Sequence, residues 1–337
     1  MKEVRIGVIG TGFMGKMHAN IFSRLPNCRL VGITDKNSRE ASEVAKKINT
    51  RVFKDYEELL LSDEIDAVSI CVSDAEHLGP AVAAAKAGKH ILLEKPIATI
   101  EQEAEIIAKE AAANNVKLAV GHLLRYDSRY RMLKYSIESG ELGEITTIYT
   151  RRNSPISDGP ARYGKHGNLT LHVAVHDIDL VLWMMQKKPI RVHAESVSIA
   201  NKSLGIEDAI FATIKFEDGS IGCLQYNWAL PKSFPTHIDA KMQVVGTKGF
   251  GSVDCSDQGV WICSDSEGLI FPDLTHWPEF SGQIAGDLRE ELSGFVNSIL
   301  HEEDFAITPN EAVESVKLAL AIIESIENET VVNLATK

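Results

Sequence analysis

The sequence predicts an α/β protein with two domains: an N-terminal doubly wound parallel sheet and a C-terminal α+β domain with a large, mostly antiparallel open sheet. Two observations lead to this prediction. Over the first third of the chain, short apolar runs alternate with segments of helical period, which is typical of βαβ units. Beyond residue 121, strand-like runs follow one another with turn signals between them. We expect the domains to cover residues 1–122 and 123–337.

The elements of the N-terminal domain follow from the period of the hydrophobic pattern. Short apolar runs predict strands at 4–9, 29–34, 51–53, 67–72, 90–93 and 117–120. Apolar residues at helical spacing predict helices from the glycine turn to residue 25 and at 38–48, 75–87 and 100–113.

In the C-terminal domain, strands are predicted at 145–151, 191–199, 209–216, 220–229, 239–245, 249–253 and 260–262. Helices are predicted at 128–139, 171–185, 286–300 and 310–327. The segment 171–185 is apolar nearly all round, so we expect a buried helix on one face of the sheet. The Ser-, Pro- and Gly-rich segment 153–168 is expected to be a loop.

Composition and charge exclude several classes of protein. The chain has 337 residues, 44% of them hydrophobic and 24% charged, so it can bury a core without disulfides. A formal net charge of −12 without a basic run disfavours a nucleic-acid partner. No apolar stretch approaches the ~18 residues of a membrane span. The chain start lacks a signal-peptide layout and the 5 cysteines are scattered, so we expect a cytoplasmic protein with reduced thiols.

The run Gly10-Thr11-Gly12-Phe13-Met14-Gly15 follows the first strand and opens a helix, in the GxGxxG pattern of the Rossmann dinucleotide-binding turn. The first glycine permits the tight turn, the second lets a pyrophosphate approach the backbone, and the third lets the helix pack close to the strand. The helix N-terminus offers N–H groups to the anion. The alternative is an ordinary glycine-rich turn without a ligand.

Asp35 ends the second strand, 20 positions after Gly15. A carboxylate at this place accepts hydrogen bonds from the ribose hydroxyls and repels a 2′-phosphate, which favours NAD over NADP. Lys36 and Arg39 lie close by in the sequence and leave NADP open as the cofactor. A helix N-cap or a turn aspartate is the alternative role for Asp35.

The tripeptide Glu94-Lys95-Pro96 follows the strand 90–93, at the carboxyl end of a strand, where ligands bind in open α/β sheets. Proline restricts the backbone before it and so fixes the direction of Lys95. An ammonium beside nicotinamide can polarise a substrate oxygen. The alternative is a Glu-Lys pair on the surface.

His172, His176 and Asp179 lie on the predicted buried helix, where steps of four and three residues place them in one sector, with Asp177 elsewhere. A neutral imidazole can accept a hydroxyl proton as hydride leaves the same carbon. One alternative is a hydrogen-bonded histidine in the core. Another is zinc, for which the usual third ligand and water-activating glutamate are not evident, so we predict no metal.

With GTGFMG, EKP and HDID in this order, the chain resembles the glucose–fructose oxidoreductase, inositol dehydrogenase and MocA family over essentially its whole length. The resemblance implies an NAD(P)-dependent oxidoreductase that acts on a hydroxyl carbon of a sugar, polyol or nucleotide-sugar. Lys95 and His176 match the catalytic residues of that family. A nucleotide- or sugar-sensing regulatory protein on the same fold is the alternative function.

The resemblance also extends the expected binding sites. For the cofactor it adds contacts at Val72, Ser73, His77, Glu94 and Lys95 to the glycine turn and Asp35. The expected substrate residues are Lys95, His122, Arg125, Arg152, His172 and His176. The family further implies a homodimer or homotetramer formed through the C-terminal sheet.

One position departs from the family pattern. Many members carry Asp where this chain has His172, and an imidazole cannot supply the same fixed negative charge. This departure weakens an assignment to the inositol dehydrogenases. The runs Arg151-Arg152-Asn153 and Pro160-Ala161-Arg162 look like those of members that act on nucleotide-linked sugars, where arginines hold a diphosphate. A solvated loop is the alternative there.

Overall fold

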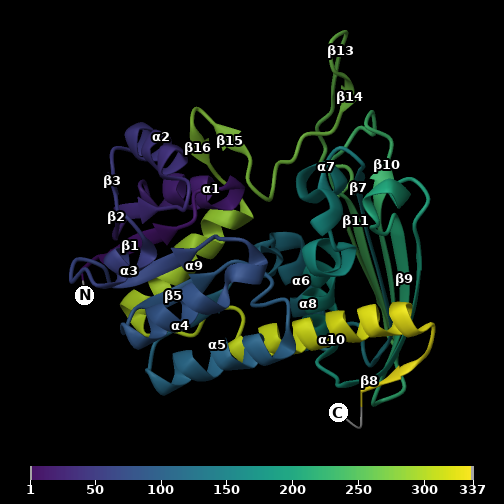
Figure 1. The fold of residues 1–337 in the computed structure, drawn as a ribbon. Coiled ribbons are helices and arrows are strands. Elements are labelled where there is room, and N and C mark those ends of the chain that lie inside the picture. The colour runs from purple at the N-terminus through teal and green to yellow at the C-terminus, as the bar shows by residue number, and fades with distance from the viewer. Residues whose placement is uncertain (1, 335–337) are drawn as a thin grey trace. The chain divides into compact units, whose positions relative to one another are not determined.

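A computed structural model describes residues 2–334 (Figure 1). Residues 1 and 335–337, at the ends of the two predicted domains, lie outside the described residues. The chain forms two compact units: residues up to Tyr126 with Thr275–Val316, and Asp127–Leu274 with residues from Lys317 onward. The predicted domain boundary after residue 122 remains a prediction. The compact units add a late segment of the chain to its N-terminal part.

The first unit is built on a six-stranded sheet in the order β3-β2-β1-β4-β5-β6, with every neighbouring pair parallel. The predicted doubly wound sheet is therefore confirmed. Its central strand has the sequence VRIGVI and is almost fully buried, as expected for a parallel sheet covered on both faces. The strand order reverses between β1 and β4, which makes the crevice beside them the expected ligand site. The strands are β1 Val4–Ile9, β2 Cys28–Thr34, β3 Arg51–Val52, β4 Ala67–Ile70, β5 His90–Leu93 and β6 Leu118–Val120.

Helices connect these strands and supply much of the core of the unit. They are α1 Phe13–Phe22, α2 Ser38–Ile48, α3 Tyr56–Leu60, α4 Leu78–Lys86 and α5 Glu101–Ala113, with 3₁₀ turns η1 Asp74–Glu76 and η2 Leu123–Tyr126. The late helix α9, Asp287–His301, belongs to the same unit. Its Leu288, Leu292 and Phe295 pack in one core with Val4 and Phe22. The short strands β15 Glu279–Phe280 and β16 Gln283–Ile284 precede it.

The second unit contains a seven-stranded sheet in the order β12-β11-β7-β10-β9-β8-β17. Only the β7–β10 pair is parallel, so the predicted mostly antiparallel sheet is confirmed. A separate hairpin is formed by β13 Ile262–Ser264 and β14 Gly268–Ile270. The sheet strands are β7 Ile145–Pro155, β8 Pro189–Val197, β9 Ala209–Phe216, β10 Ile221–Leu230, β11 Asp239–Gly246, β12 Phe250–Asp254 and β17 Val332–Asn333.

Two predicted segments of the second unit differ from the structure. The expected loop 153–168 contains the end of β7, the short helix α7 Gly159–Tyr163 and the turn η3 Gly164–His166. Tertiary packing requires a glycine at the start of α7, because a Cβ at Gly159 would lie 2.2 Å from the buried ring of Trp228. The expected helix 171–185 begins as a π-helical turn, η4 Thr170–Ala174, and continues as α8 Val175–Met185.

The remaining helices are α6 Ser128–Glu138 and α10 Pro309–Asn328. Within the second unit, α8 packs against β7 of the sheet (Figure 1), as expected from its nearly uniform apolar character. No helix in the described part of the chain has the length and hydropathy needed to cross a membrane.

Candidate functional site

Each of the three positions in the turn after β1 requires or favours glycine for a different physical reason. Gly10 has a φ of +90°, and a Cβ there would lie 2.7 Å from the carbonyl carbon of Cys71. A Cβ at Gly15 would lie 1.9 Å from the carbonyl oxygen of Gly10, so this position sets the distance between α1 and β1. A Cβ at Gly12 would meet no atom within 4 Å. Gly12 therefore leaves open space beside the N-terminus of α1, where an anion is favoured.

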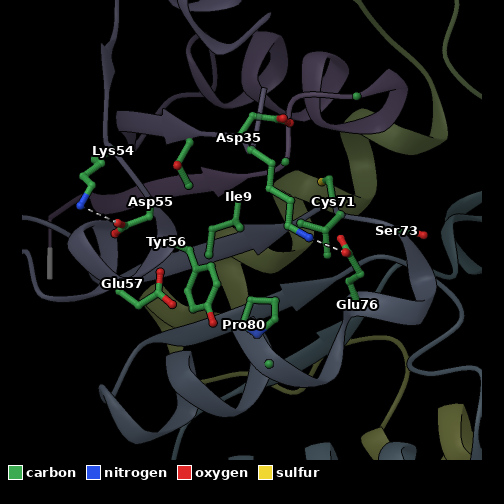
Figure 2. Close-up of a pocket in the computed structure, with 16 residues that line it drawn as sticks. Ile9, Asp35, Lys54, Asp55, Tyr56, Glu57, Cys71, Ser73, Glu76 and Pro80 are labelled. Atoms are coloured by element: carbon green, nitrogen blue, oxygen red, sulfur yellow. Dashed lines mark hydrogen bonds and ion pairs between the residues drawn. The ribbon is translucent and has the colours of Figure 1, made fainter. Parts of the chain in front are cut away.

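A cavity of about 640 Å³ lies beside this turn at the carboxyl ends of β1, β2 and β4 (Figure 2). This is the place that the reversal of strand order predicts for a ligand. The open backbone at Gly12 and the size of the cavity fit a dinucleotide with its pyrophosphate at the start of α1. Five of the residues expected to contact the cofactor line the cavity: Gly10, Gly12, Asp35, Val72 and Ser73.

Asp35 lies in the cavity wall, and its carboxylate is already hydrogen-bonded. It accepts from the Thr11 amide at 2.5 Å, from the Thr11 hydroxyl at 3.1 Å and from the Asn37 amide at 2.7 Å. The cap of α2 is Asn37, whose side chain accepts from the Glu40 amide, so Asp35 is not that cap. The bond from the Asn37 amide, two residues on, is that of a turn aspartate. Asp35 instead ties the end of β2 to the glycine turn.

The charged groups around the opening of the cavity were not part of the expected site. Lys36 forms an ion pair with Glu76, and both side chains line the cavity. The segment Lys54–Glu57, which follows the short strand β3, lines it as well (Figure 2). The rule that ligands bind at the carboxyl ends of strands could have found this segment. The predicted strand there had only three residues, which was too weak a signal to place the segment after it in the ligand site.

His77 is buried and turned toward the EKP tripeptide. Its Nδ1 lies 2.9 Å from the carbonyl oxygen of Pro96, in a hydrogen bond across the start of α4. Burial lowers the pKa of His77, so its ring is neutral and Nδ1 donates to that carbonyl. The Lys95–Pro96 peptide is cis. The structure therefore places His77 where it fixes the backbone after Lys95, and its expected contact with the cofactor remains a prediction.

Glu94 follows β5 directly and is almost completely buried beside Lys95. Its Oε2 accepts from the Lys95 amide at 3.2 Å, and its Oε1 lies 3.1 Å from Nε2 of His18. Burial works against the charge of Glu94, but the hydrogen bond and charge of His18 outweigh it and lower the pKa of this carboxyl. Glu94 is thus an ionised group that holds the Lys95 backbone.

His18 is a site residue that the sequence reasoning missed. It lies on the buried face of α1, with Nδ1 at 2.8 Å from the Ser69 hydroxyl and 3.4 Å from the Cys71 sulfur. Burial alone would lower its pKa, but the Cys71 sulfur and the Glu94 carboxylate raise the pKa of His18 well above its usual range. The sequence did offer a signal for His18. It is a polar residue one turn after Gly15, on the face of the helix that packs on the sheet.

The segment after β6 holds two of the expected substrate residues, and both are buried. His122 is 2% exposed. Arg125 in η2 is 3% exposed and donates from NH1 to the Glu311 carboxylate and to the Ala306 carbonyl, each at 2.9 Å. These contacts connect the segment after the parallel sheet to the chain just before α10 and to the first turn of α10, within the first unit. A substrate role for either residue remains a prediction.

His172 lies in the π-helical turn before α8, and its tautomer is fixed. Its Nδ1 accepts from the Asn168 amide at 3.0 Å, so a neutral ring carries its proton on Nε2. The ring stacks on Tyr163 with centroids 3.9 Å apart and an angle of 1° between planes. His172 is therefore a neutral donor rather than a substitute for a carboxylate. The π-helical turn also changes the angular step to His176 that the sequence analysis assumed.

Arg152 and Asp177 form a buried ion pair in the second unit. The guanidinium donates from Nε to Oδ2 at 2.6 Å and from NH2 to Oδ1 at 3.2 Å. Burial opposes the charge of Arg152, but the Asp177 carboxylate outweighs it and raises the pKa of the guanidinium. Asp177 is buried in this pair, whereas His176, at the start of α8, is half-buried. The substrate contact expected of Arg152 stays a prediction. A substrate would have to compete with Asp177 for the guanidinium.

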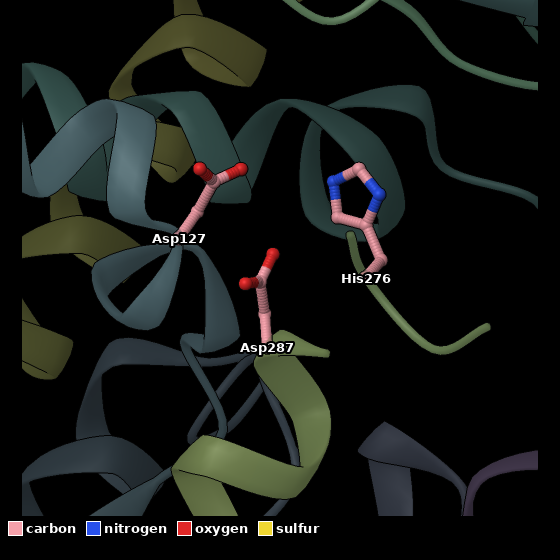
Figure 3. Close-up of side chains that lie close together, drawn as sticks. All are labelled: Asp127, His276 and Asp287. Atoms are coloured by element: carbon pink, nitrogen blue, oxygen red, sulfur yellow. The ribbon is translucent and has the colours of Figure 1, made fainter. Parts of the chain in front are cut away.

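Two further potential ligand groups meet at the start of α9. His276 and Asp287 bring ligand atoms within 4.8 Å of each other (Figure 3). The Asp287 amide donates to the Thr275 carbonyl at 2.7 Å, which fixes the start of the helix. The prediction that the protein uses no metal is not tested by this pair.

Comparison with known proteins identifies the family of this chain. Residues 4–122 match the model of the oxidoreductase family with an NAD-binding Rossmann fold, and residues 130–250 match the GFO/IDH/MocA C-terminal domain. The chain is 30% identical over 301 residues to UDP-N-acetylglucosamine 3-dehydrogenase of Acidithiobacillus ferrooxidans, covering 89% of this chain and 90% of that protein. The chain belongs to the GFO/IDH/MocA oxidoreductase family.

Other members of the GFO/IDH/MocA family match almost the whole chain. The scyllo-inositol 2-dehydrogenase (NAD(+)) of Bacillus subtilis is 26% identical over 344 residues, covering 99% of this chain and 97% of that protein. The crystal structure of scyllo-inositol dehydrogenase from Lactobacillus casei, with bound NAD(H) and scyllo-inositol, is 28% identical with a TM-score of 0.87 and covers 99% and 100% of the two chains. The predicted family, fold class, oxidoreductase activity and NAD cofactor are confirmed.

Proposed function

We propose that this NAD-dependent oxidoreductase acts on a hydroxyl carbon of a sugar, a polyol or a nucleotide-linked sugar. The observation that carries the proposal is the placement of Lys95. It follows β5, on the half of the sheet beyond the reversal of strand order, where the nicotinamide half of a dinucleotide binds in this topology. Its backbone is held on one side by Glu94 and on the other by the His77–Pro96 hydrogen bond.

We assign separate roles to the two expected catalytic residues. Bound NAD supplies the acceptor for hydride from the hydroxyl carbon. The Lys95 ammonium polarises the substrate oxygen and stabilises the negative charge that develops on it. His176 accepts the hydroxyl proton as the carbonyl forms, and it returns that proton when the reaction runs in reverse. His172, as a neutral donor, hydrogen-bonds an acceptor oxygen of the substrate.

The substrate class follows from relatives of two kinds. Named relatives act on scyllo-inositol and on UDP-N-acetylglucosamine. The neutral His172 gives no fixed negative charge, and this favours a substrate other than a free inositol. A panel of UDP-N-acetylglucosamine, scyllo-inositol, myo-inositol and free glucose, with NAD and absorbance at the nicotinamide band, tests the proposal. Binding of NAD without turnover of any of them would contradict it and favour the regulatory alternative.

Two variants test the residue roles on whichever substrate is turned over. His176→Ala should lower kcat by about 10²–10⁴, the usual contribution of a general base, with the Kd for NAD unchanged. Lys95→Ala should lower kcat by a similar factor because the oxygen loses its electrostatic stabilisation. His237→Ala and Lys109→Ala are matched controls, since both side chains are mostly exposed in surface ion pairs. Full turnover by either test variant would contradict its assigned role.

We further propose that two copies of the chain associate through the C-terminal sheet. Large apolar side chains on its strands are exposed, among them Phe211 at 53% and Phe250 at 58%. Phe250 is paired across the strands with Val245, which is also exposed. Exposed apolar area of this kind is typical of association surfaces. Light scattering should give a dimer or tetramer, and Phe211→Lys with Phe250→Lys should give a monomer; a monomeric wild type would contradict the proposal.

A further inference from the structure

Three buried ionisable side chains that act on one another electrostatically are called here the carboxyl–histidine cluster: His18, Glu94 and Glu291. All three belong to the first unit. His18 comes from α1, Glu94 follows β5, and Glu291 lies one turn into α9. His18 and Glu291 are completely buried, and Glu94 is 8% exposed. The roles proposed above use Glu94 but give no function to Glu291.

The contacts within the cluster are unequal. His18 is 3.1 Å from Glu94 through Nε2 and 2.8 Å from Ser69 through Nδ1. Glu94 also accepts from the Lys95 amide. Neither carboxyl oxygen of Glu291 is hydrogen-bonded to any residue that the structure describes. The one imidazole of the cluster is therefore paired with Glu94, and Glu291 has no such contact among the described residues.

The surroundings of Glu291 disfavour a second negative charge. α9 packs against α1, β1 and η2. The ionisable groups that act on Glu291 from these and neighbouring elements are Glu94, His18 and Asp287. Arg125, the cation of η2, is hydrogen-bonded to Glu311. Burial first, and then the charge of Glu94, raise the pKa of Glu291 well above its usual range, against a smaller opposing effect of His18.

A carboxyl group in such a site is kept neutral because ionisation without a partner costs more than holding the proton. If Glu291 ionised, it would compete with Glu94 for the single imidazolium. The pair that holds the Lys95 amide would then be weakened. A neutral carboxylic acid fills the same volume without that competition.

We propose that Glu291 is a positioning residue that works as a neutral carboxylic acid, keeping His18 paired with Glu94 and so holding the backbone of Lys95 at the nicotinamide half of the cofactor site. The proposal rests on the proposed function only in the role of Lys95. Its tests use folding and NAD binding without any substrate. Failure of the substrate panel and failure of this proposal are therefore distinguishable.

The first test compares the stability of the full-length wild type and Glu291→Gln between pH 5 and pH 8 by chemical denaturation. In the folded wild type Glu291 keeps its proton above the ordinary pKa of a glutamate, whereas the unfolded chain loses it. Wild-type stability should therefore fall as pH rises, by up to about tenfold in the unfolding equilibrium constant per pH unit relative to Glu291→Gln. The neutral amide has no such dependence, so the variant should become the more stable protein at neutral pH.

The neighbouring Glu290 is exposed on the same helix and supplies the matched control. Glu290→Gln should leave the pH dependence of wild-type stability unchanged. If Glu291→Gln is instead less stable than the wild type at pH 8, and the difference disappears in acid, Glu291 is ionised in the folded protein. The proposal is then wrong.

The second test measures the Kd for NAD at pH 7 by calorimetry for Glu291→Gln and Glu291→Ala. The amide keeps the shape and neutrality of the acid, so Glu291→Gln should bind NAD within about twofold of the wild type. Glu291→Ala removes a completely buried carboxyl group of the cluster and should weaken NAD binding by at least about tenfold. Binding by Glu291→Ala equal to the wild type would refute a positioning role, and an equal loss in both variants would refute neutrality.

Discussion

The two compact units bury charge in different ways. In the second unit, Arg152 and Asp177 match one cation to one anion with two hydrogen bonds between them. In the first unit, the carboxyl–histidine cluster holds one imidazole and two carboxyl groups, and Glu291 is left without a hydrogen-bond partner among the described residues. In a matched pair each charge compensates the other, so the removal of one partner leaves the other buried and uncompensated. An unmatched cluster must retain a proton, so its state depends on pH and on what binds nearby.

The largest effect is expected when the matched pair is broken. Arg152→Ala leaves Asp177 buried without its cation and should lower the free energy of unfolding by about 3–5 kcal/mol. Arg152→Met with Asp177→Leu removes both charges and should recover much of that loss. Urea denaturation measures both effects. If Arg152→Ala keeps wild-type stability but raises KM for a UDP-sugar, Arg152 binds substrate and the pair is not what fixes the fold.

The next largest effect separates glycines that build the turn from one that borders the cofactor. Gly15→Ala places a Cβ against the Gly10 carbonyl, so α1, which carries His18, must shift; we expect a loss of about 1–3 kcal/mol in stability and weaker NAD binding. Gly12→Ala meets no protein atom within 4 Å and should keep wild-type stability while NAD binding falls. Equal stability of the two variants in thermal unfolding would contradict this distinction.

Substitution of His18, the imidazole of the unmatched cluster, tests how the cluster is charged. His18→Gln removes the partner of Glu94 and should cost about 1–3 kcal/mol at pH 6. Because the pKa of His18 is raised in the folded protein, its stabilisation is complete below the ordinary histidine pKa and is lost as pH rises through the raised value. The difference between wild type and variant should therefore shrink toward alkaline pH. A difference that grows with pH would show that His18 is neutral when folded.

The smallest effect concerns a carboxylate that is satisfied by backbone and hydroxyl donors rather than by a cation. Asp35→Ser keeps a small acceptor beside Thr11 but removes the negative charge from the cavity wall. The ratio of the Kd for NADP to that for NAD should fall by about tenfold, since repulsion of the 2′-phosphate is relieved. Fluorescence titration with both dinucleotides measures the ratio. An unchanged ratio would place cofactor discrimination elsewhere, with Lys36 as the next candidate.

The sequence by itself determined the parts of the protein that are set by local pattern. Apolar runs located the strands of the parallel sheet along the chain, and the glycine spacing located the cofactor turn. The EKP tripeptide and the helix with His176 were found in the same way. The family followed from the combination of these motifs and was confirmed by comparison.

Only the tertiary structure decided which charges meet. Arg152 pairs with Asp177 across 25 positions, and α9, a late segment of the chain, adds the buried Glu291 to the unit that holds His18 and Glu94. The π-helical turn before α8 and the helix α7 also depend on packing, the latter on the fit of Gly159 to Trp228. The spacing of apolar residues in the sequence predicts which side chains are buried. The partner of a buried charge depends on the path of the chain in three dimensions.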